Sequence, residues 1–323
     1  MSTVSFYVDS FGRGHITRQC ALVRALKKRT KVIFNCAGYL DELEKMLPDA
    51  QVRKADFGLK IVPKGLGVDL ERTRELNASL RRDLEARVDA VTADLKATRP
   101  DLIVADIPAE VFLAAERLGI PVFAVSNFGW NIILDEIFGK GSEEGKMYSE
   151  AYSTATKTLV LPFNEPMSSF RNRQKVGLLR RRLTKRMRKS KKVLCFLGPD
   201  FGRALNIDRR NFWALPPDYY EGQDYVASSR AVFSKPAYGV CSEAVANGIP
   251  MFLKKRSNFC ESEYILKALK GVKMVPEDTD PFSWILGQME DVNWVTLRKI
   301  KEKYLVNSDE EIASMILAHL GEK

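Results

Sequence analysis

Short apolar runs alternate with amphipathic segments along most of this chain. The runs that we expect to form buried strands are, in chain order, 4–8, 32–34, 102–106, 121–126, 158–161, 193–197, 212–215, 231–234 and 251–253. Between most of them, apolar residues recur every three or four positions, which is the spacing of one face of a helix. Strands that alternate with helices form parallel sheets, so the pattern predicts an α/β fold.

The chain has 323 residues, enough for two domains that each bury a core. Apolar periodicity is weak between 166 and 190, where charged residues dominate. We therefore expect a Rossmann-like domain at 1–165, a basic linker at 166–190, a second domain at 191–305 and a final helix at 306–323.

Two helices are predicted from apolar spacing alone. A long one is expected from about Leu70 to Ala97, because leucines and valines recur along it every three or four residues. A short basic amphipathic one is expected in the linker, where four apolar residues between 178 and 187 have helical spacing.

Positive charge is concentrated in the predicted linker. The chain carries a formal net charge of +10, and twelve of the residues from Arg171 to Lys192 are lysine or arginine. This segment could bind an anionic membrane surface. Nucleic acid is a less expected partner, because no aromatic residues are interleaved with the cations. A solvated linker is the simplest interpretation.

The composition also disfavours several classes of protein. The chain has no run of eighteen apolar residues and no signal-peptide pattern at its start, so we expect a cytoplasmic protein, with peripheral attachment to a membrane left open by the basic segment. Five cysteines without a C-x-x-C pair and only two histidines make a zinc site improbable. No cofactor and no metal are expected.

A glycine-rich turn follows the first predicted strand. Gly12 and Gly14 fit a dinucleotide-binding fingerprint, but Thr17 occupies the third glycine position, and Asn35 stands near the place where a ribose-binding acid is expected. A nicotinamide cofactor is therefore disfavoured, and no phosphate-binding P-loop motif occurs.

Four polar or aromatic residues follow strand ends in the first half: His15, Asp106, Asn127 and Trp130. The carboxyl ends of parallel strands share one edge of a sheet, so we expect these side chains to gather there. His15 is the only histidine before residue 319 and is the candidate general base, with Asp106 orienting its imidazole. A purely structural role for His15 in closing the turn stays open.

The segment from 231 to 256 has the order strand, tight turn, helix, strand. Pro236 and Gly239 are expected to end the strand and leave the first amides of the helix pointing at an anion. Ser242 and Glu243 lie in the first turns of this helix. The plainer alternative is that Glu243 is a solvated acid favoured by the helix dipole.

These motifs resemble those of GT-B glycosyltransferases. Residues 234–256 are similar to the donor-binding segment of that superfamily, and the first half contains G-x-G-H at 12–15, V-x-D at 104–106 and S-N-F-x-W at 126–130. The same set resembles the glycosyltransferase-like domain of L-arabinokinases and, more distantly, the peptidoglycan N-acetylglucosaminyltransferase.

The resemblance implies a fold and a set of binding residues. The fold would be GT-B, with two Rossmann-like domains facing across a cleft, a trimmed C-terminal domain and a last helix that returns to the first domain. Glu243 would hold the ribose, Glu261 the sugar hydroxyls, and the loop at Gly198 would face the diphosphate. Asn127 and Trp130 would lie on the acceptor side. The remaining residues implied on the nucleotide-sugar side are Arg13, Gly14, Ser234, Lys235, Tyr238, Gly239 and Ser242.

The resemblance also implies a function. We expect a metal-independent glycosyltransferase that moves a sugar from a nucleotide sugar, most simply a UDP sugar, to an unidentified acceptor. The alternatives are a sugar-nucleotide 2-epimerase, a non-catalytic nucleotide-sugar binder and a nucleic-acid-binding protein on the same fold.

Overall fold

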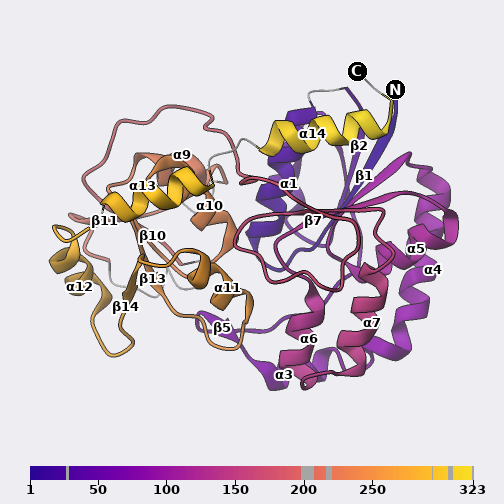
Figure 1. Ribbon diagram of the computed structural model, residues 1–323, viewed down its shortest axis with the longest axis horizontal. Helices are drawn as coiled ribbons and strands as arrows, with labels where there is room; N and C mark the ends of the chain where they lie inside the picture. Colours follow the sequence, from indigo (N-terminus) through magenta and orange to yellow (C-terminus); the bar gives the residue numbers. More distant parts are fainter. Residues whose placement is uncertain (27–28, 198–206, 216–219, 293, 305–307, 322–323) are drawn as a thin grey trace.

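The computed structural model describes residues 1–26, 29–197, 207–215, 220–292, 294–304 and 308–321. Two parallel sheets form the cores of two lobes that lie side by side in Figure 1. The predicted α/β class is confirmed. The final helix lies over the lobe that contains the start of the chain.

The first domain is built on a seven-stranded parallel sheet in the order β3-β2-β1-β6-β7-β8-β9. Its strands are β1 (Thr3–Val8), β2 (Lys31–Cys36), β3 (Gln51–Lys54), β6 (Leu102–Asp106), β7 (Val122–Ser126), β8 (Lys157–Val160) and β9 (Arg173–Lys175). Val4, Phe6 and Val8 pack into one core cluster, whereas Tyr7 packs into another on the opposite face. The sheet is therefore buried on both faces, as the continuous apolar runs predict.

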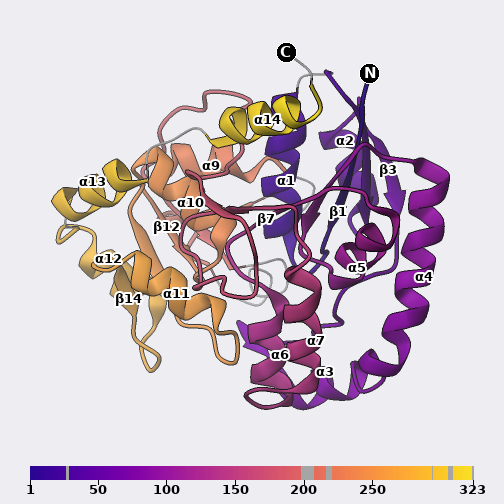
Figure 2. The same cartoon turned by 45° about the vertical axis from the view of Figure 1, so that its right-hand side comes forward.

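Helices cover both faces of this sheet (Figures 1 and 2). They are α1 (Arg13–Leu26), α2 (Leu40–Met46), α3 (Leu70–Leu76), α4 (Leu80–Thr98), α5 (Ala109–Leu118), α6 (Trp130–Phe138) and α7 (Glu143–Tyr152). α1 packs on one face, and α4, α5 and α7 contact one another on the other.

The predicted long helix at 70–97 is in fact two helices, α3 and α4, separated at Asn77. The side chain of Asn77 accepts from the Lys60 amide at 3.1 Å and donates to the Lys60 carbonyl at 2.8 Å. A side chain that satisfies main-chain groups of a distant loop competes with a continuous helix. Leu76, just before the break, is exposed rather than buried.

The second domain has a five-stranded parallel sheet in the order β11-β10-β12-β13-β14. Its strands are β10 (Val193–Phe196), β11 (Phe212–Ala214), β12 (Ala231–Ser234), β13 (Met251–Lys254) and β14 (Lys273–Val275). The helices after β11 are α9 (Gly222–Ser228), α10 (Tyr238–Asn247), α11 (Glu261–Ala268), α12 (Pro281–Gln288), α13 (Trp294–Lys303) and α14 (Ser308–His319).

The last helix, α14, returns to the first domain. It contacts α1 and crosses it in both ribbon views, and the His319 ring lies 5.0 Å from the ring of Phe123 in β7. The contact predicted for the final helix is therefore present.

The connection between the domains differs from its prediction. β9 is the edge strand of the first sheet, although we placed its residues in the linker. No helix forms between Lys175 and Val193, a stretch that the structure describes throughout. Tertiary contacts hold this irregular stretch in place: Leu178 and Leu179 are buried, and the Leu179 amide donates to the Tyr238 hydroxyl at 3.0 Å.

A small hairpin of the first domain, β4 (Pro63–Lys64) and β5 (Gly67–Val68), reaches the second domain. The Val68 amide donates to the Ser257 carbonyl at 3.3 Å, and Arg256 Nε donates to the Leu66 carbonyl at 3.0 Å. The glycine- and proline-rich loop at 62–67 is thus a bridge between the domains.

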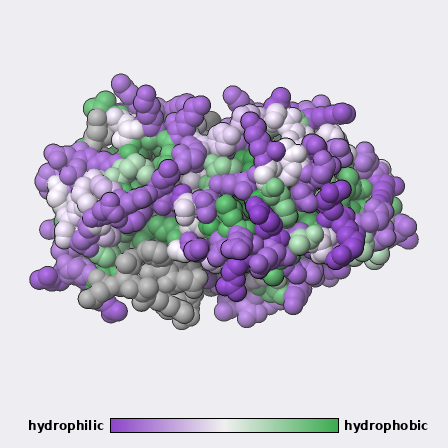
Figure 3. All heavy atoms as spheres, turned by 90° about the horizontal axis from the view of Figure 1, so that it is seen from below, coloured by the Kyte–Doolittle hydropathy of each residue, from purple (hydrophilic) through white to green (hydrophobic). Residues whose placement is uncertain are grey.

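One face of the molecule, seen from below in Figure 3, is mainly hydrophilic, with hydrophobic atoms visible only in scattered areas. The large apolar side chains are instead collected in the core clusters on either side of the two sheets.

Candidate functional site

The residues that follow strand ends in the first domain lie together at one edge of its sheet. Asp106 is the last residue of β6, Asn127 follows β7, and His15 lies in the first turn of α1, which follows β1. All three are buried and joined through hydrogen bonds. The predicted gathering of these side chains is confirmed, because β1, β6 and β7 are parallel neighbours.

His15 and Asp106 form a hydrogen bond of 2.8 Å between Nδ1 and Oδ1. Burial alone would raise the pKa of Asp106, but the charges of Arg18 and His15 outweigh it and hold that pKa well below its usual range. Asp106 is therefore a carboxylate. His15 Nδ1 also lies 2.9 Å from Arg18 Nη2, so its role depends on the tautomer of the ring. In the tautomer with the proton on Nδ1, His15 donates to Asp106 and the lone pair of the imidazole lies on Nε2, as a general base requires.

Arg18 holds Asp106 in place. Its Nε donates to Oδ2 at 2.6 Å and its Nη2 to Oδ1 at 2.5 Å, which is a bidentate pairing. Gln19 donates to the same carboxylate at 2.8 Å. With both oxygens engaged and buried, the carboxylate cannot rotate away from His15.

Sequence reasoning missed Arg18, although one signal could have found it. Arg18 lies three residues after His15, so on a helix that starts at Arg13 both side chains project from the same face. Its Nη1 also donates to Asn127 Oδ1 at 2.6 Å, and its guanidinium lies 5.2 Å from the centre of the Tyr238 ring. Arg18 thus links the two domains.

Aromatic side chains enclose His15. The Trp130 ring lies nearly parallel to the imidazole at 6.0 Å, and the Phe128 ring meets it edge-on at 5.6 Å. Phe11 and Phe259 pack against Trp130 in turn, and Phe259 comes from the second domain. The surroundings of His15 therefore have a low dielectric, in which charge interactions are strong. That Trp130 and Asn127 bind an acceptor stays a prediction.

The second domain meets this edge directly. Glu261, in the first turn of α11, accepts a 2.9 Å hydrogen bond from Asn127 Nδ2. Gly239, in the first turn of α10, approaches the first turn of α1: a Cβ at Gly239 would lie 3.7 Å from the Gly14 α-carbon. The amino ends of α1 and α10 therefore face each other at the domain boundary.

Several hydroxyls of the predicted donor segment are engaged within the protein. Ser234 donates to the Phe196 carbonyl at 2.8 Å and Ser242 to the Gly239 carbonyl at 2.9 Å. Tyr238 is buried, and its hydroxyl accepts from the linker amide already described. These contacts order the strand, the turn and the helix; we expected the three side chains to contact a nucleotide sugar instead.

Glu243 forms a buried ion pair with Arg181 of the connecting segment. Glu243 is 2% exposed, and Arg181 Nε donates to its Oε1 at 2.9 Å, while Arg181 Nη1 donates to the Tyr220 carbonyl at 2.5 Å. Burial raises the pKa of Glu243, and the charge of Arg181 opposes that rise. The alternative that Glu243 is a solvated surface acid is wrong, and one cation of the predicted solvated linker is part of a core contact.

Arg13, Lys235 and Gly198 were also predicted to bind the donor. Arg13 forms an ion pair with Glu42 of its own domain at 2.7 Å, so part of its charge is neutralised within that domain. Lys235 follows β12 and is partly buried. Gly198 lies outside the described residues.

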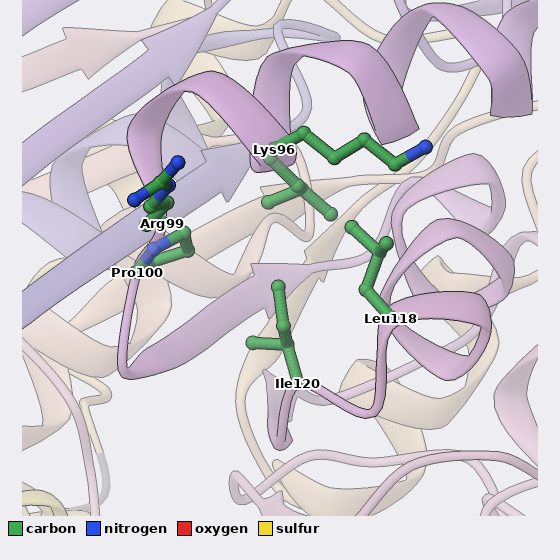
Figure 4. Close-up of a pocket in the computed structure, with 6 residues that line it drawn as sticks. Lys96, Arg99, Pro100, Leu118 and Ile120 are labelled. Carbon is green, nitrogen blue, oxygen red and sulfur yellow. The ribbon is translucent and has the colours of Figure 1, made fainter.

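A hollow of about 480 Å³ lies away from this site (Figure 4). Leu95, Lys96, Arg99, Pro100, Leu118 and Ile120 line it. Pro100 and Ile120 precede β6 and β7, so the hollow lies at the amino-end edge of the sheet, opposite to His15. Ligands of parallel sheets bind at the carboxyl ends of the strands, which favours the His15 edge.

Within the described part of the chain, no group of three or more histidine, cysteine, aspartate or glutamate side chains is placed to hold a metal ion. No described helix combines the length and the apolar character that crossing a membrane requires.

Comparison with known proteins places the chain among glycosyltransferase-like folds. No family model matches it. An L-arabinokinase of Arabidopsis thaliana is 24% identical over 87% of this chain, and the match spans only 31% of that protein's length.

Solved structures resemble the whole chain. A calicheamicin glycosyltransferase has a TM-score of 0.65 and 17% identity, covering 99% of this chain and 98% of its own. An Arabidopsis thaliana protein in complex with UDP-L-rhamnose has a TM-score of 0.64 and 14% identity, covering 98% of each chain. A glycosyltransferase in complex with dTDP has a TM-score of 0.62 and 14% identity, covering 99% of this chain and 100% of its own. The chain therefore has the predicted GT-B fold.

Proposed function

We propose that this chain is a glycosyltransferase that moves a sugar from a nucleoside-diphosphate sugar to an acceptor hydroxyl, with His15 as the general base. The observation that carries the proposal is the buried His15–Asp106 hydrogen bond, fixed by Arg18, at the edge of the sheet that meets the second domain. A UDP or dTDP sugar is the donor class favoured, because structures of the same fold are complexes of UDP-L-rhamnose and dTDP.

The base would act through Nε2. It accepts the proton of the acceptor hydroxyl while the acceptor oxygen forms a bond to the anomeric carbon of the sugar. The bond between that carbon and the diphosphate oxygen breaks, and its electron pair leaves with the diphosphate. The imidazolium that forms lies against the Asp106 carboxylate at 2.8 Å, which stabilises it in a buried setting.

The leaving diphosphate would be bound by the amino end of α10. No described side chain caps this helix, whose first residues are Tyr238 and Gly239, and the dipole and amides of a helix amino end favour an anion. Glu243 lies in the same helix, where Arg181 fixes its carboxylate. We assign the ribose hydroxyls to Glu243 and the sugar hydroxyls to Glu261, which is held by Asn127.

Calorimetric titration and a turnover assay test this proposal together. UDP, dTDP, GDP and their sugar conjugates are titrated into wild type, His15→Ala and His319→Ala. We expect one nucleotide to bind all three proteins, and turnover to be lost only in His15→Ala. The His319 variant is the matched control, because His319 belongs to α14 and packs on Phe123 of β7, away from the site.

Two results would count against the proposal. Absence of binding by every nucleotide would remove the donor half, and turnover that survives in His15→Ala would remove the base. Identification of the product sugar separates transfer from epimerisation, because an epimerase returns the donor with an altered sugar and needs no acceptor.

A further inference from the structure

The end of the second domain that points away from the first exposes several large apolar side chains. Seven such side chains are exposed among the described residues, and four of them lie between positions 274 and 295: Met274, Leu286, Trp294 and Val295. Trp294 and Val295 begin α13 and are 61% and 64% exposed. Exposed apolar side chains that gather in one region, rather than singly, indicate a surface that binds a partner.

The chain crosses the amino-end edge of the second sheet just before α13. Ile285 of α12 packs into the core cluster on one face of this sheet, and Ile300 of α13 packs into the cluster on the other face. Between these helices, Glu290 pairs at 3.2 Å with Arg230, which directly precedes β12. Trp294 therefore lies beside the amino ends of the strands. In Figures 1 and 2, α12 and α13 are at the left-hand end of the molecule, away from the first domain.

Basic residues gather on the same edge. The segments that lead into β10, β11, β12 and β14 carry five exposed cations: Lys191, Arg209, Arg210, Arg230 and Lys270. Residues that precede parallel strands share one edge of a sheet, just as residues that follow them share the other. Arg298, one turn after Trp294, is also exposed. The described acids of these segments and of the connection before α13 are fewer: Asp208, Glu290 and Asp291.

The ion pairs at this edge do not neutralise it. Arg210 pairs with Asp208 at 3.1 Å, and Arg230 pairs with Glu290 as described above. Both are exposed pairs, which contribute little and are screened by salt. Within the described part of the chain, three of the other cations form no ion pair: Lys191, Arg209 and Arg298. Their charge is available to an anionic partner.

A hollow of about 460 Å³ opens next to Trp294. The residues that line it are Gly248, Trp294, Leu297, Arg298, Lys301 and Glu302. Two cations, one acid and the indole ring thus border the same recess. The recess has room for an anionic group beside an apolar ring.

We propose that this end of the second domain binds the surface of an anionic phospholipid membrane, with Trp294 and Val295 among the headgroups and the surrounding lysines and arginines against the phosphates. An indole ring next to an aliphatic side chain and flanked by cations is typical of surfaces that lie in a membrane interface. Protein interfaces are depleted in lysine. Sites for single-stranded nucleic acid use several stacking rings rather than an aliphatic neighbour.

The partner is one that the basic segment also suggested, but the surface is different. Arg182 of that segment pairs with Asp309 and Glu310 of α14, the helix that returns to the first domain, at 2.6 and 2.8 Å. The end of the segment does reach the amino-end edge, because the Ser190 amide donates at 2.8 Å to the carbonyl of Ser228, two positions before β12 begins its lead-in at Arg230. The proposed surface lies opposite the domain boundary, so a bound membrane leaves the candidate site accessible.

Cosedimentation with vesicles tests the inference. Vesicles of phosphatidylcholine alone are compared with vesicles that also contain phosphatidylserine. The apolar contact is tested with Trp294→Ala and with the conservative Trp294→Phe. The charge is tested with a triple variant in which Lys191, Arg209 and Arg298 are each replaced by glutamine.

Matched controls come from the first domain. Leu76→Ala removes a leucine of α3 that is 53% exposed. A second triple variant replaces three exposed cations of α3 and α4 by glutamine: Arg72, Arg81 and Arg82. These controls change the apolar surface and the net charge in the same sense as the test variants, but at a different place.

We expect the protein to bind the vesicles that contain phosphatidylserine, and to bind them more weakly as salt is added. Trp294→Ala should weaken binding at least about tenfold, because more than half of a large apolar side chain leaves water on binding. Trp294→Phe should retain much of the affinity. The triple variant of the second domain should lose about a hundredfold, since each basic residue near an anionic surface contributes about fivefold. The controls should bind like wild type.

Several results would overturn the inference. They are equal binding to both kinds of vesicle, affinities that are the same in wild type and in the Trp294 and triple variants, and no binding to phosphatidylserine vesicles at all. Binding of DNA or RNA in place of the vesicles, lost in the same triple variant, would assign these cations to nucleic acid instead. The assay contains no nucleotide sugar, so its outcome is independent of the proposed glycosyltransferase function.

Discussion

Replacing Asp9 by asparagine should make the protein more stable at neutral pH, although it removes a charge beside the candidate base. Asp9 is 2% exposed, its Oδ2 has no partner, and its pKa is raised from 3.8 to about 6. Asparagine keeps the oxygen that accepts from the Phe11 amide and replaces the unpaired carboxylate oxygen by an uncharged NH₂ group.

The size of the effect follows from the pKa. A rise of about two units corresponds to about 3 kcal/mol between the ionised and protonated forms. Below pH 4 Asp9 is mostly protonated in both the folded and the unfolded chain, so its ionisation does not lower the free energy of unfolding. Between pH 4 and 6 the unfolded chain releases the proton first, so the folded state loses stability as the pH rises. Above pH 6 the full cost is present in wild type and absent in Asp9→Asn.

Urea unfolding of both proteins at pH 4, 5, 6 and 7 measures this difference. We expect the free energy of unfolding of Asp9→Asn, minus that of wild type, to increase by up to about 3 kcal/mol from pH 4 to 7. Asp56→Asn removes an exposed carboxylate from the loop that follows β3 and controls for the change in net charge. A difference that stays flat, or that shrinks as the pH rises, would refute the account of Asp9 as a strained buried carboxylate.

Two further substitutions test other contacts. Arg181→Met leaves Glu243 as an unpaired buried charge and should lower the free energy of unfolding by about 3–5 kcal/mol. A second change, Glu243→Gln, should recover much of this loss. Equal losses in the single and double variants would show that the charge is not the cause. Gly67→Ala places a Cβ 2.1 Å from the Ser257 carbonyl oxygen and should lower the melting temperature and expose the domain boundary to limited proteolysis, whereas Gly287→Ala, in open space, should do neither.

The positions of His15, Asp106 and Asn127 could be predicted because they depend on topology alone. Once short apolar runs alternate with helices, the sheet is parallel, and residues after successive strands must share one edge. His15 and Asp106 lie 91 positions apart in the chain, yet His15 follows β1 and Asp106 ends β6, and these two strands are neighbours in the sheet.

The contacts that hold the site could not be predicted, because they depend on how distant segments pack. The basic segment has the spacing of an amphipathic helix, but Leu179 and Arg181 bind Tyr238 and Glu243 of α10 and the main chain of Tyr220, and the segment forms no helix. The density of charge in this segment predicted that all its lysines and arginines would be exposed to solvent. Arg181 is buried instead because it pairs with Glu243, and the local sequence around Arg181 does not indicate this distant partner.

The hairpin that bridges the two domains contributes main-chain atoms to its hydrogen bonds: the Val68 amide and the carbonyls of Leu66 and Val68. Peptide groups are the same whatever side chains they carry, so mutational drift at these positions need not weaken the joint. Within the hairpin, position 67 is restricted because the Ser257 main chain leaves no room for a Cβ, and position 65 because its φ is +58°. In a comparison of sequences the hairpin side of this joint would register as little more than these two glycines, whereas on the second domain the side chains of Arg256 and Asn258 form its bonds.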